Sequence, residues 1–157
     1  MADTDQSTEK SPATAPVVHN LIAMAHVADV DASVSFYQLL GLAPREVMRD
    51  ESDRAFWASL RAGAGSIMLT RASGPIRPED QAVLFYLYTD DVEAMRRHLL
   101  KSGQVHDGAV FAGQPGPNGG RAVAFEVTRP FYMPAGELRV HDPDGYCLLI
   151  GQQSGSR

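Results

Sequence analysis

Hydrophobic and polar positions follow one pattern that occurs twice along this chain. An apolar run over Leu21 to Val27 precedes an amphipathic stretch that ends at Gly41. A second apolar run over Val83 to Thr89 precedes another amphipathic stretch that ends at Gly103. Each apolar run predicts a strand, and each amphipathic stretch closed by glycine predicts a helix. The pattern therefore indicates an internal repeat of a strand followed by a helix.

Charged and apolar residues mark the two predicted helices. In the first half, Asp31 is expected to cap a helix from Ala32 whose apolar stripe is formed by Phe36, Leu39 and Leu40.

In the second half, Asp90 and Glu93 form a candidate capping pair. Val92, Met95 and Leu99 follow at helical spacing on one face. Both helices are thus predicted to bury one apolar stripe.

Short strand-like segments separated by turn residues follow each predicted helix. They are Phe56 to Arg61 and Ser66 to Thr70 in the first half, and Val123 to Val127, Leu138 to Val140 and Tyr146 to Ile150 in the second. Each half is interpreted as a βαβββ module, which gives an α+β fold with curved mixed sheets around a cup. We expect one domain over residues 17–153, with modules at about 19–72 and 82–152. The polar residues 1–16 are predicted to form a disordered tail, and residues 154–157 a frayed end.

Composition and charge narrow the range of partners. The formal net charge is −5, and no long basic cluster is present, so the sequence argues against nucleic acid or an anionic membrane as the partner. The single cysteine, Cys147, excludes an internal disulfide and a CxxC pair, and it fits a reducing, cytoplasmic location. No apolar run approaches the roughly 18 residues needed to span a bilayer.

Three motifs resemble the vicinal-oxygen-chelate superfamily of glyoxalases, extradiol dioxygenases and bleomycin-resistance proteins. They begin at Asp29 (DxDxSxxFYxxLG), at Leu87 (LYTDDV) and at Gly136 (GELRVHDPDGY). The resemblance covers about residues 20 to 152 and implies paired βαβββ modules around a ligand cup. Because the superfamily includes both enzymes and drug-binding proteins, the fold alone does not decide the function.

Metal-dependent members of this superfamily place one ligand on the first and one on the last strand of each module. By register, the resemblance places these positions at Ile22, Met68, Leu84 and Leu149. Divalent ions need histidine nitrogen or carboxylate oxygen, so these four side chains predict that no metal and no cofactor is bound at the usual centre.

An alternative is a relocated metal or acid-base site formed by His26, Glu137 and His141 in a lyase, isomerase or dioxygenase. His26 and Glu137 are the candidate catalytic residues in that case. A third alternative is a module that binds a protein partner and has no ligand, which predicts a cleft filled by its own side chains.

The side chains expected to line the cup are mainly apolar and aromatic, with a few polar groups. They are Met24, His26, Trp57, Met68, Tyr86, Tyr88, Glu137, Arg139 and Leu149. Such a lining is typical of a small-molecule pocket. The sequence therefore favours a metal-free protein that sequesters or senses an aromatic or amphipathic compound, as a homodimer. Glu137 and Arg139 share a strand face and can form an ion pair. Whether the modules pair within one chain or exchange between two is left open.

Overall fold

The computed structural model describes residues 16, 18–110 and 120–153. Its helices and strands run in the order β1 (Ala23–Val27), α1 (Val30–Leu39), β2 (Ala43–Arg49), β3 (Ala55–Ala62), β4 (Gly65–Arg71), the short 3₁₀ helix η1 (Pro78–Asp80), β5 (Phe85–Thr89), α2 (Val92–Lys101), β6 (Val105–Asp107), β7 (Ala122–Thr128), β8 (Glu137–His141) and β9 (Cys147–Gln152). The predicted tail at residues 1–16 and the frayed end at 154–157 lie almost wholly outside the described residues. The α+β class is confirmed.

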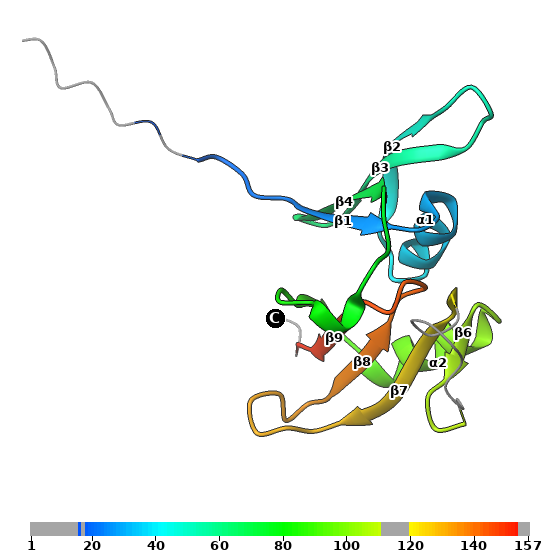
Figure 1. Ribbon diagram of the computed structural model, residues 1–157. Helices are drawn as coiled ribbons and strands as arrows, with labels where there is room; N and C mark the ends of the chain where they lie inside the picture. Colours follow the sequence, from blue (N-terminus) through cyan, green and yellow to red (C-terminus); the bar gives the residue numbers. More distant parts are fainter. Residues whose placement is uncertain (1–15, 17, 111–119, 154–157) are drawn as a thin grey trace, which may run out of the picture.

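The strands form two separate sheets, one for each half of the chain. The first sheet has the order β1-β4-β3-β2 and the second β5-β9-β8-β7-β6. β1 pairs in parallel with β4, and β5 pairs in parallel with β9, so the order β1-β4-β3-β2 recurs as β5-β9-β8-β7. The second sheet has one further edge strand, β6, which pairs in parallel with β7. Figure 1 shows the two sheets as two lobes, with α1 beside the first and α2 beside the second. The sequence repeat thus corresponds to a structural repeat.

Alternation along the strands determines which face of each sheet is buried. Ala25, Val27, Leu69 and Leu60 are buried, and α1 packs on β3 and β4 at this face. The intervening residues of β1, including Met24, are exposed. Because successive side chains point to opposite faces, each sheet has a core face covered by its helix and an outer face without one.

The helix boundaries differ from the predicted ones by two residues or fewer. Asp29 rather than Asp31 caps α1, because its carboxylate accepts a hydrogen bond from the Ala32 backbone at 3.0 Å. Asp91 rather than Asp90 caps α2 through Ala94 at 2.8 Å. In both cases the capping residue is the aspartate with extended backbone angles. Each helix start has two aspartates close together in the sequence, and the pattern alone did not distinguish between them.

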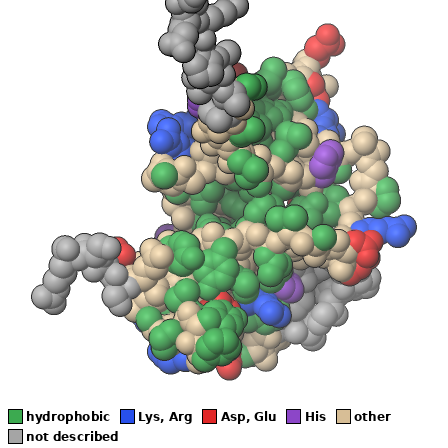
Figure 2. Space-filling model, turned by 90° about the vertical axis from the view of Figure 1, so that its left-hand side faces the viewer, with side chains coloured by type: hydrophobic (Ala, Val, Ile, Leu, Met, Phe, Trp, Pro, Cys, Tyr) green, Lys and Arg blue, Asp and Glu red, His purple; other side chains and the backbone are tan. Residues whose placement is uncertain are grey.

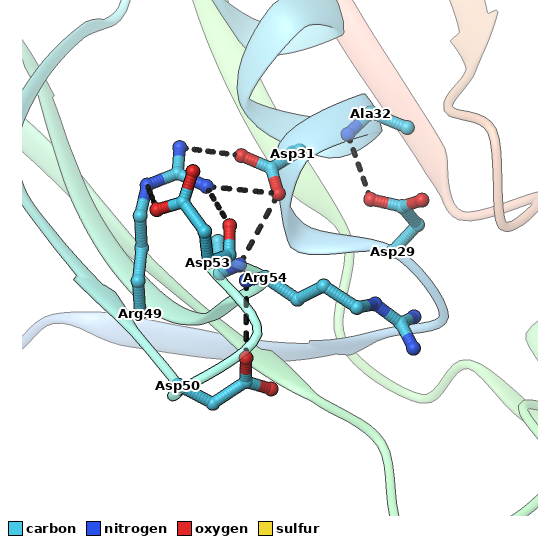
Figure 3. A network of polar contacts seen from close by, with 8 residues as sticks. Asp29, Asp31, Ala32, Arg49, Asp50, Asp53 and Arg54 are labelled. Atoms are coloured by element: carbon cyan, nitrogen blue, oxygen red, sulfur yellow. Dashed lines mark hydrogen bonds and ion pairs between the residues drawn. The ribbon is translucent and has the colours of Figure 1, made fainter.

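Asp31 does not cap the helix as predicted. Figure 3 shows the contacts that its carboxylate makes instead. It accepts hydrogen bonds from the Arg49 guanidinium at 2.8 and 3.3 Å and from the Ala55 backbone at 3.2 Å. The Arg49 side chain also donates to the Asp53 carbonyl at 2.8 Å. These contacts attach the β2–β3 hairpin to the first turn of α1. The pKa of Asp31 is lowered, chiefly by the hydrogen bond from Arg49.

Polar contacts on the helix side join the two lobes. The Tyr37 hydroxyl donates to Asp142 at 3.1 Å, and the Ala28 backbone donates to Asp144 at 3.1 Å. The Tyr146 hydroxyl donates to the His26 carbonyl at 2.8 Å. The turn between β8 and β9, which contains both aspartates, is therefore the main polar connection between the modules. Among the described residues, no helix is both long and apolar enough to cross a membrane.

Candidate ligand-binding site

The outer face of the first sheet brings together the predicted residues of the first module. Met24 lies opposite Met68 across β1 and β4, and His26 lies opposite Thr70. Trp57 on β3 is opposite the same Thr70, so these side chains share one face. Met24 is 54% exposed, while Trp57 and Met68 are half-buried. This face is an accessible apolar surface with one histidine at its edge.

The outer face of the second sheet brings together the predicted residues of the second module. Across β5, β9 and β8, Tyr86 lies opposite Leu149, and Leu149 lies opposite Arg139. The Tyr86 hydroxyl donates to the Glu137 carboxylate at 2.5 Å. The rings of Tyr86 and Tyr88 lie 5.3 Å apart in a tilted arrangement. Aromatic surface and one buried carboxylate therefore lie next to each other on this sheet.

Gly151 allows Tyr86 to reach Glu137. A Cβ at Gly151 would lie 3.0 Å from Tyr86 Cε1 and 2.7 Å from Met133 Cε. Glu137 is on β8 and Tyr86 on β5, with β9 and its Gly151 between them. The missing side chain lets the tyrosine ring cross β9 and lets Met133, from the loop between β7 and β8, pack over it.

The loop between β7 and β8 adds an aromatic residue that the sequence analysis missed. The Tyr132 hydroxyl donates to the second oxygen of the Glu137 carboxylate at 3.3 Å. Phe131 packs on Tyr132 with ring centroids 5.3 Å apart and is 95% exposed. The Pro130, Phe131 and Tyr132 run contains an apolar cluster next to a proline, and this was the available signal. The predicted set of site residues therefore lacked one partner of Glu137.

Glu137 is the one buried carboxylate of the predicted site. It is 7% exposed, and both its oxygens accept a tyrosine hydroxyl. The expected ion pair with Arg139 is wrong, because no charged nitrogen lies within 4.0 Å of Glu137 among the described residues. Glu137 turns toward Tyr86 and Tyr132, whereas Arg139 stays exposed.

Burial controls the protonation of the neighbouring groups. It raises the pKa of Tyr86, and the Glu137 carboxylate raises it further, so the phenol remains a hydrogen-bond donor. It lowers the pKa of His141, with Arg139 adding to the effect, so this imidazole is disposed to be neutral. It also raises the pKa of the Cys147 thiol, which disfavours a nucleophilic thiolate.

The two outer faces are not joined directly by polar contacts. Among the described residues, no hydrogen bond or ring contact links the set Met24, His26, Trp57 and Met68 to the set Tyr86, Tyr88, Glu137, Arg139 and Leu149. A cavity of about 560 Å³ is lined by residues of both modules, among them Leu21, Ala23, Tyr86 and Tyr88. In Figure 2, hydrophobic side chains gather over both lobes, with a hollow between them.

The four positions implied for a metal do not fit a divalent ion. In the structure, Met68 lies beside Met24, and Leu149 lies beside Tyr86 and Arg139. Ile22, Leu84 and Leu149 provide no donor atom, and Met68 provides only a thioether. Hard divalent ions require oxygen or imidazole ligands, so this set cannot hold one.

The relocated site of the alternative hypothesis is not assembled in this structure. His26 is exposed in the first lobe, His141 packs on Phe125 with centroids 4.9 Å apart, and Glu137 is held by tyrosines. Within the described ranges, no group of three or more His, Cys, Asp and Glu residues could hold a metal ion.

A comparison of the chain with models of protein families gives one match. Residues 20–149 match the model of the Glyoxalase/Bleomycin resistance protein/Dioxygenase superfamily. No curated protein matches the chain.

Several solved structures share the fold at low identity. A bleomycin-binding protein from bleomycin-producing Streptomyces verticillus, solved with copper(II)-bleomycin, is 18% identical, with a TM-score of 0.60 over 88% of this chain and 99% of that chain. A bleomycin resistance determinant encoded on the transposon Tn5 is 19% identical, with a TM-score of 0.61 over 88% and 100%. TnmS3, an antibiotic binding protein from Streptomyces sp. CB03234, is 20% identical, with a TM-score of 0.51 over 88% and 98%.

Proposed function

Because the chain belongs to the Glyoxalase/Bleomycin resistance protein/Dioxygenase superfamily, we propose that it is a metal-free small-molecule-binding protein that sequesters or senses an aromatic or amphipathic compound. The observation behind the proposal is the chemistry of the outer faces. Where metal-dependent members hold an ion, this chain has hydrocarbon and thioether groups. Around them lie exposed aromatic rings and one buried carboxylate with tyrosine partners. Such a surface binds a ligand by burying apolar area and orients it with few polar groups.

The similar structures support binding over catalysis as the default. Among them are bleomycin-binding proteins and an antibiotic binding protein. The aromatic pair Tyr86 and Tyr88 and the single Trp57 are the groups that we propose contact the compound.

We also propose that the protein acts as a homodimer in the cytoplasm. Large apolar side chains remain exposed on the outer faces, among them Met24, Met48, Leu84, Tyr86 and Tyr88. Exposed apolar patches on a protein surface mark sites of interaction. A second copy placed on these faces would enclose a ligand between sheets of two chains.

The test is a fluorescence titration that follows Trp57. Protein stripped with a chelator is titrated with a panel of aromatic compounds, and elemental analysis checks that no divalent ion remains. We expect saturable binding that Tyr88→Ala weakens about tenfold, because an exposed ring that stacks on a ligand contributes about 1 to 1.5 kcal/mol. Gln38→Ala, at an exposed position of α1, is the control and should leave binding unchanged.

Two results would contradict the proposal. One is the absence of saturable binding by every compound. The other is stoichiometric iron, manganese, nickel or zinc in protein purified without chelator, lost on His26→Ala, which would favour the enzyme alternative.

A further inference from the structure

A strand irregularity on the second sheet builds a cavity that the sequence pattern does not reveal. In the β7–β8 pair, Ala124 is opposite Val140 and Val127 is opposite Leu138, with a bulge between. Phe125 and Glu126 therefore share the place of one residue. Both line a cavity of about 610 Å³, although neighbours in a regular strand point to opposite faces. The other lining residues are Gly108, Ala109, Thr128, Glu137 and Arg139.

The aromatic side of this cavity is held in place from several directions. A Cβ at Gly108 would lie 2.6 Å from Phe125 Cδ1, so the ring fits because that residue is glycine. The His141 ring packs on the Phe125 ring edge-on at 4.9 Å. Arg96, paired with Asp107, donates to the Phe125 carbonyl at 2.7 Å. Phe125 is thus a preorganised surface for a ligand.

The charges that line the cavity sum to a negative value. Glu126 and Glu137 each provide a carboxylate, and Arg139 provides the one guanidinium among the lining residues. In the part of the chain that the structure describes, neither carboxylate has a cationic partner within 4.0 Å. A buried carboxylate that is stabilised only by hydroxyl groups becomes more stable when a cation approaches it.

We propose that this cavity receives the cationic end, a protonated amine or a quaternary ammonium, of the compound that the protein binds. The inference rests on the proposed binding function and specifies its ligand class. The cation would lie between the Glu126 and Glu137 carboxylates and against the aromatic ring of Phe125, which attracts cations through its π face. The positive charge of Arg139 repels the cation. It therefore reduces the preference of the cavity for a cationic group without cancelling it.

The test compares three probes with the same ring and different end groups. They are 2-naphthylmethylamine, 2-naphthylmethanol and 2-naphthoate, titrated calorimetrically at pH 7 into the full chain. We expect the amine to bind about tenfold more tightly than the alcohol, and the carboxylate to bind most weakly, because one charge-assisted contact is worth roughly 1.5 kcal/mol or more.

Four variants assign the preference to the cavity. Glu137→Gln and the exposed Glu126→Gln should each reduce the amine-to-alcohol ratio severalfold, and Arg139→Gln should increase it. Glu51→Gln, in the exposed β2–β3 turn, is the matched control and should leave the ratio unchanged. Because Glu126 is exposed, its variant tests the proposal even if Glu137→Gln folds poorly.

Equal affinity of the amine and the alcohol would overturn the cationic ligand class while leaving the binding function intact. Tightest binding of the carboxylate, lost in Arg139→Gln, would overturn it in favour of an anionic ligand. Failure of all three probes to bind would overturn this inference and contradict the proposed function as well.

Discussion

At the scale of single residues, the least expected environment is that of Asp142. It is fully buried in the β8–β9 turn, where its carboxylate accepts hydrogen bonds from Tyr37 and from the backbone of Asp144 and Tyr146. Burial nevertheless dominates and raises its pKa to about 7. In the sequence this residue stood out only as part of the motif that begins at Gly136, because a sequence does not show which segment will be covered by a tyrosine from the other module.

The raised pKa predicts how stability depends on pH. Between the unfolded value of 3.8 and about 7, the folded protein binds more protons at Asp142 than the unfolded chain does. The contribution to the free energy of unfolding is therefore largest at low pH and is lost as pH rises toward 7, by on the order of 4 kcal/mol in total.

The variant Asp142→Asn should remove this dependence. The amide can accept the two backbone hydrogen bonds and donate to the Tyr37 oxygen, so we expect stability near that of the wild type at pH 5 and higher stability at pH 8. Urea unfolding at pH 5, 6, 7 and 8 measures the free energy of unfolding of the wild type and the variant. Asp80→Asn, at an exposed position, is the control. An unchanged slope in Asp142→Asn would show that other groups cause the pH dependence.

At the scale of elements, the sequence predicted the strands that have one buried face. The apolar runs at Leu21 to Val27, Ser66 to Thr70 and Tyr146 to Ile150 correspond to β1, β4 and β9, with ends shifted by one or two residues. β2 was not located, because its residues are almost all exposed and lack alternation. Such a strand is held by its pairing with β3 and by the Arg49 contacts rather than by a hydrophobic face.

The short strand β6 and the bulge in β7 were also missed. β6 has three residues, too few to display a period. The bulge at Phe125 and Glu126 depends on how β7 pairs with β8, and pairing is a property of two segments. Phe125 and Glu126 were therefore not predicted as lining residues, whereas Glu137 and Arg139 were.

The start of β8 offers a test of close packing between helix and sheet. Gly136 has φ +135°, and a Cβ there would lie 2.8 Å from Val92 Cγ1 and 3.3 Å from Val127 Cγ1. Gly136→Ala should lower the free energy of unfolding by about 2 to 4 kcal/mol through backbone strain and overpacking.

Gly74→Ala is the matched control, since a Cβ at Gly74 would meet no heavy atom within 4 Å. It should change stability by less than about 1 kcal/mol. Thermal or urea unfolding measures the loss of stability in each of the two variants relative to the wild type. Equal losses would mean that the contact with α2 does not restrict this position.

At the scale of the whole molecule, the repeat predicted two βαβββ modules, and the structure confirms the repeat with one additional strand, β6, at the edge of the second sheet. The sequence could also place each site residue on its outer face, because faces follow from alternation. It could not place the two faces relative to each other. That arrangement depends on contacts between modules, such as Tyr37 with Asp142 and Tyr146 with His26, which have no signature in either half.

The exposed outer faces predict self-association. We expect sedimentation equilibrium at micromolar concentration to give twice the mass of the 17.0 kDa chain. Met24→Glu should shift the equilibrium toward the monomer, because it places a charge on the apolar face of β1. Gln38→Glu on α1 is the control for the added charge. A wild-type protein that remains monomeric at 100 μM would contradict the homodimer.

The central claim is that one compound is bound by the outer faces of both sheets, and methionine methyl groups report on it most directly. Met24 and Met68 lie on the first outer face, Met133 packs beside Tyr86 on the second, and Met95 packs against the core on α2. In a ¹³C-methyl NMR titration with a binding aromatic compound, we predict saturable shifts for the first three methyls and little change for Met95. Shifts confined to Met95, or to methyls of one sheet only, would contradict the account.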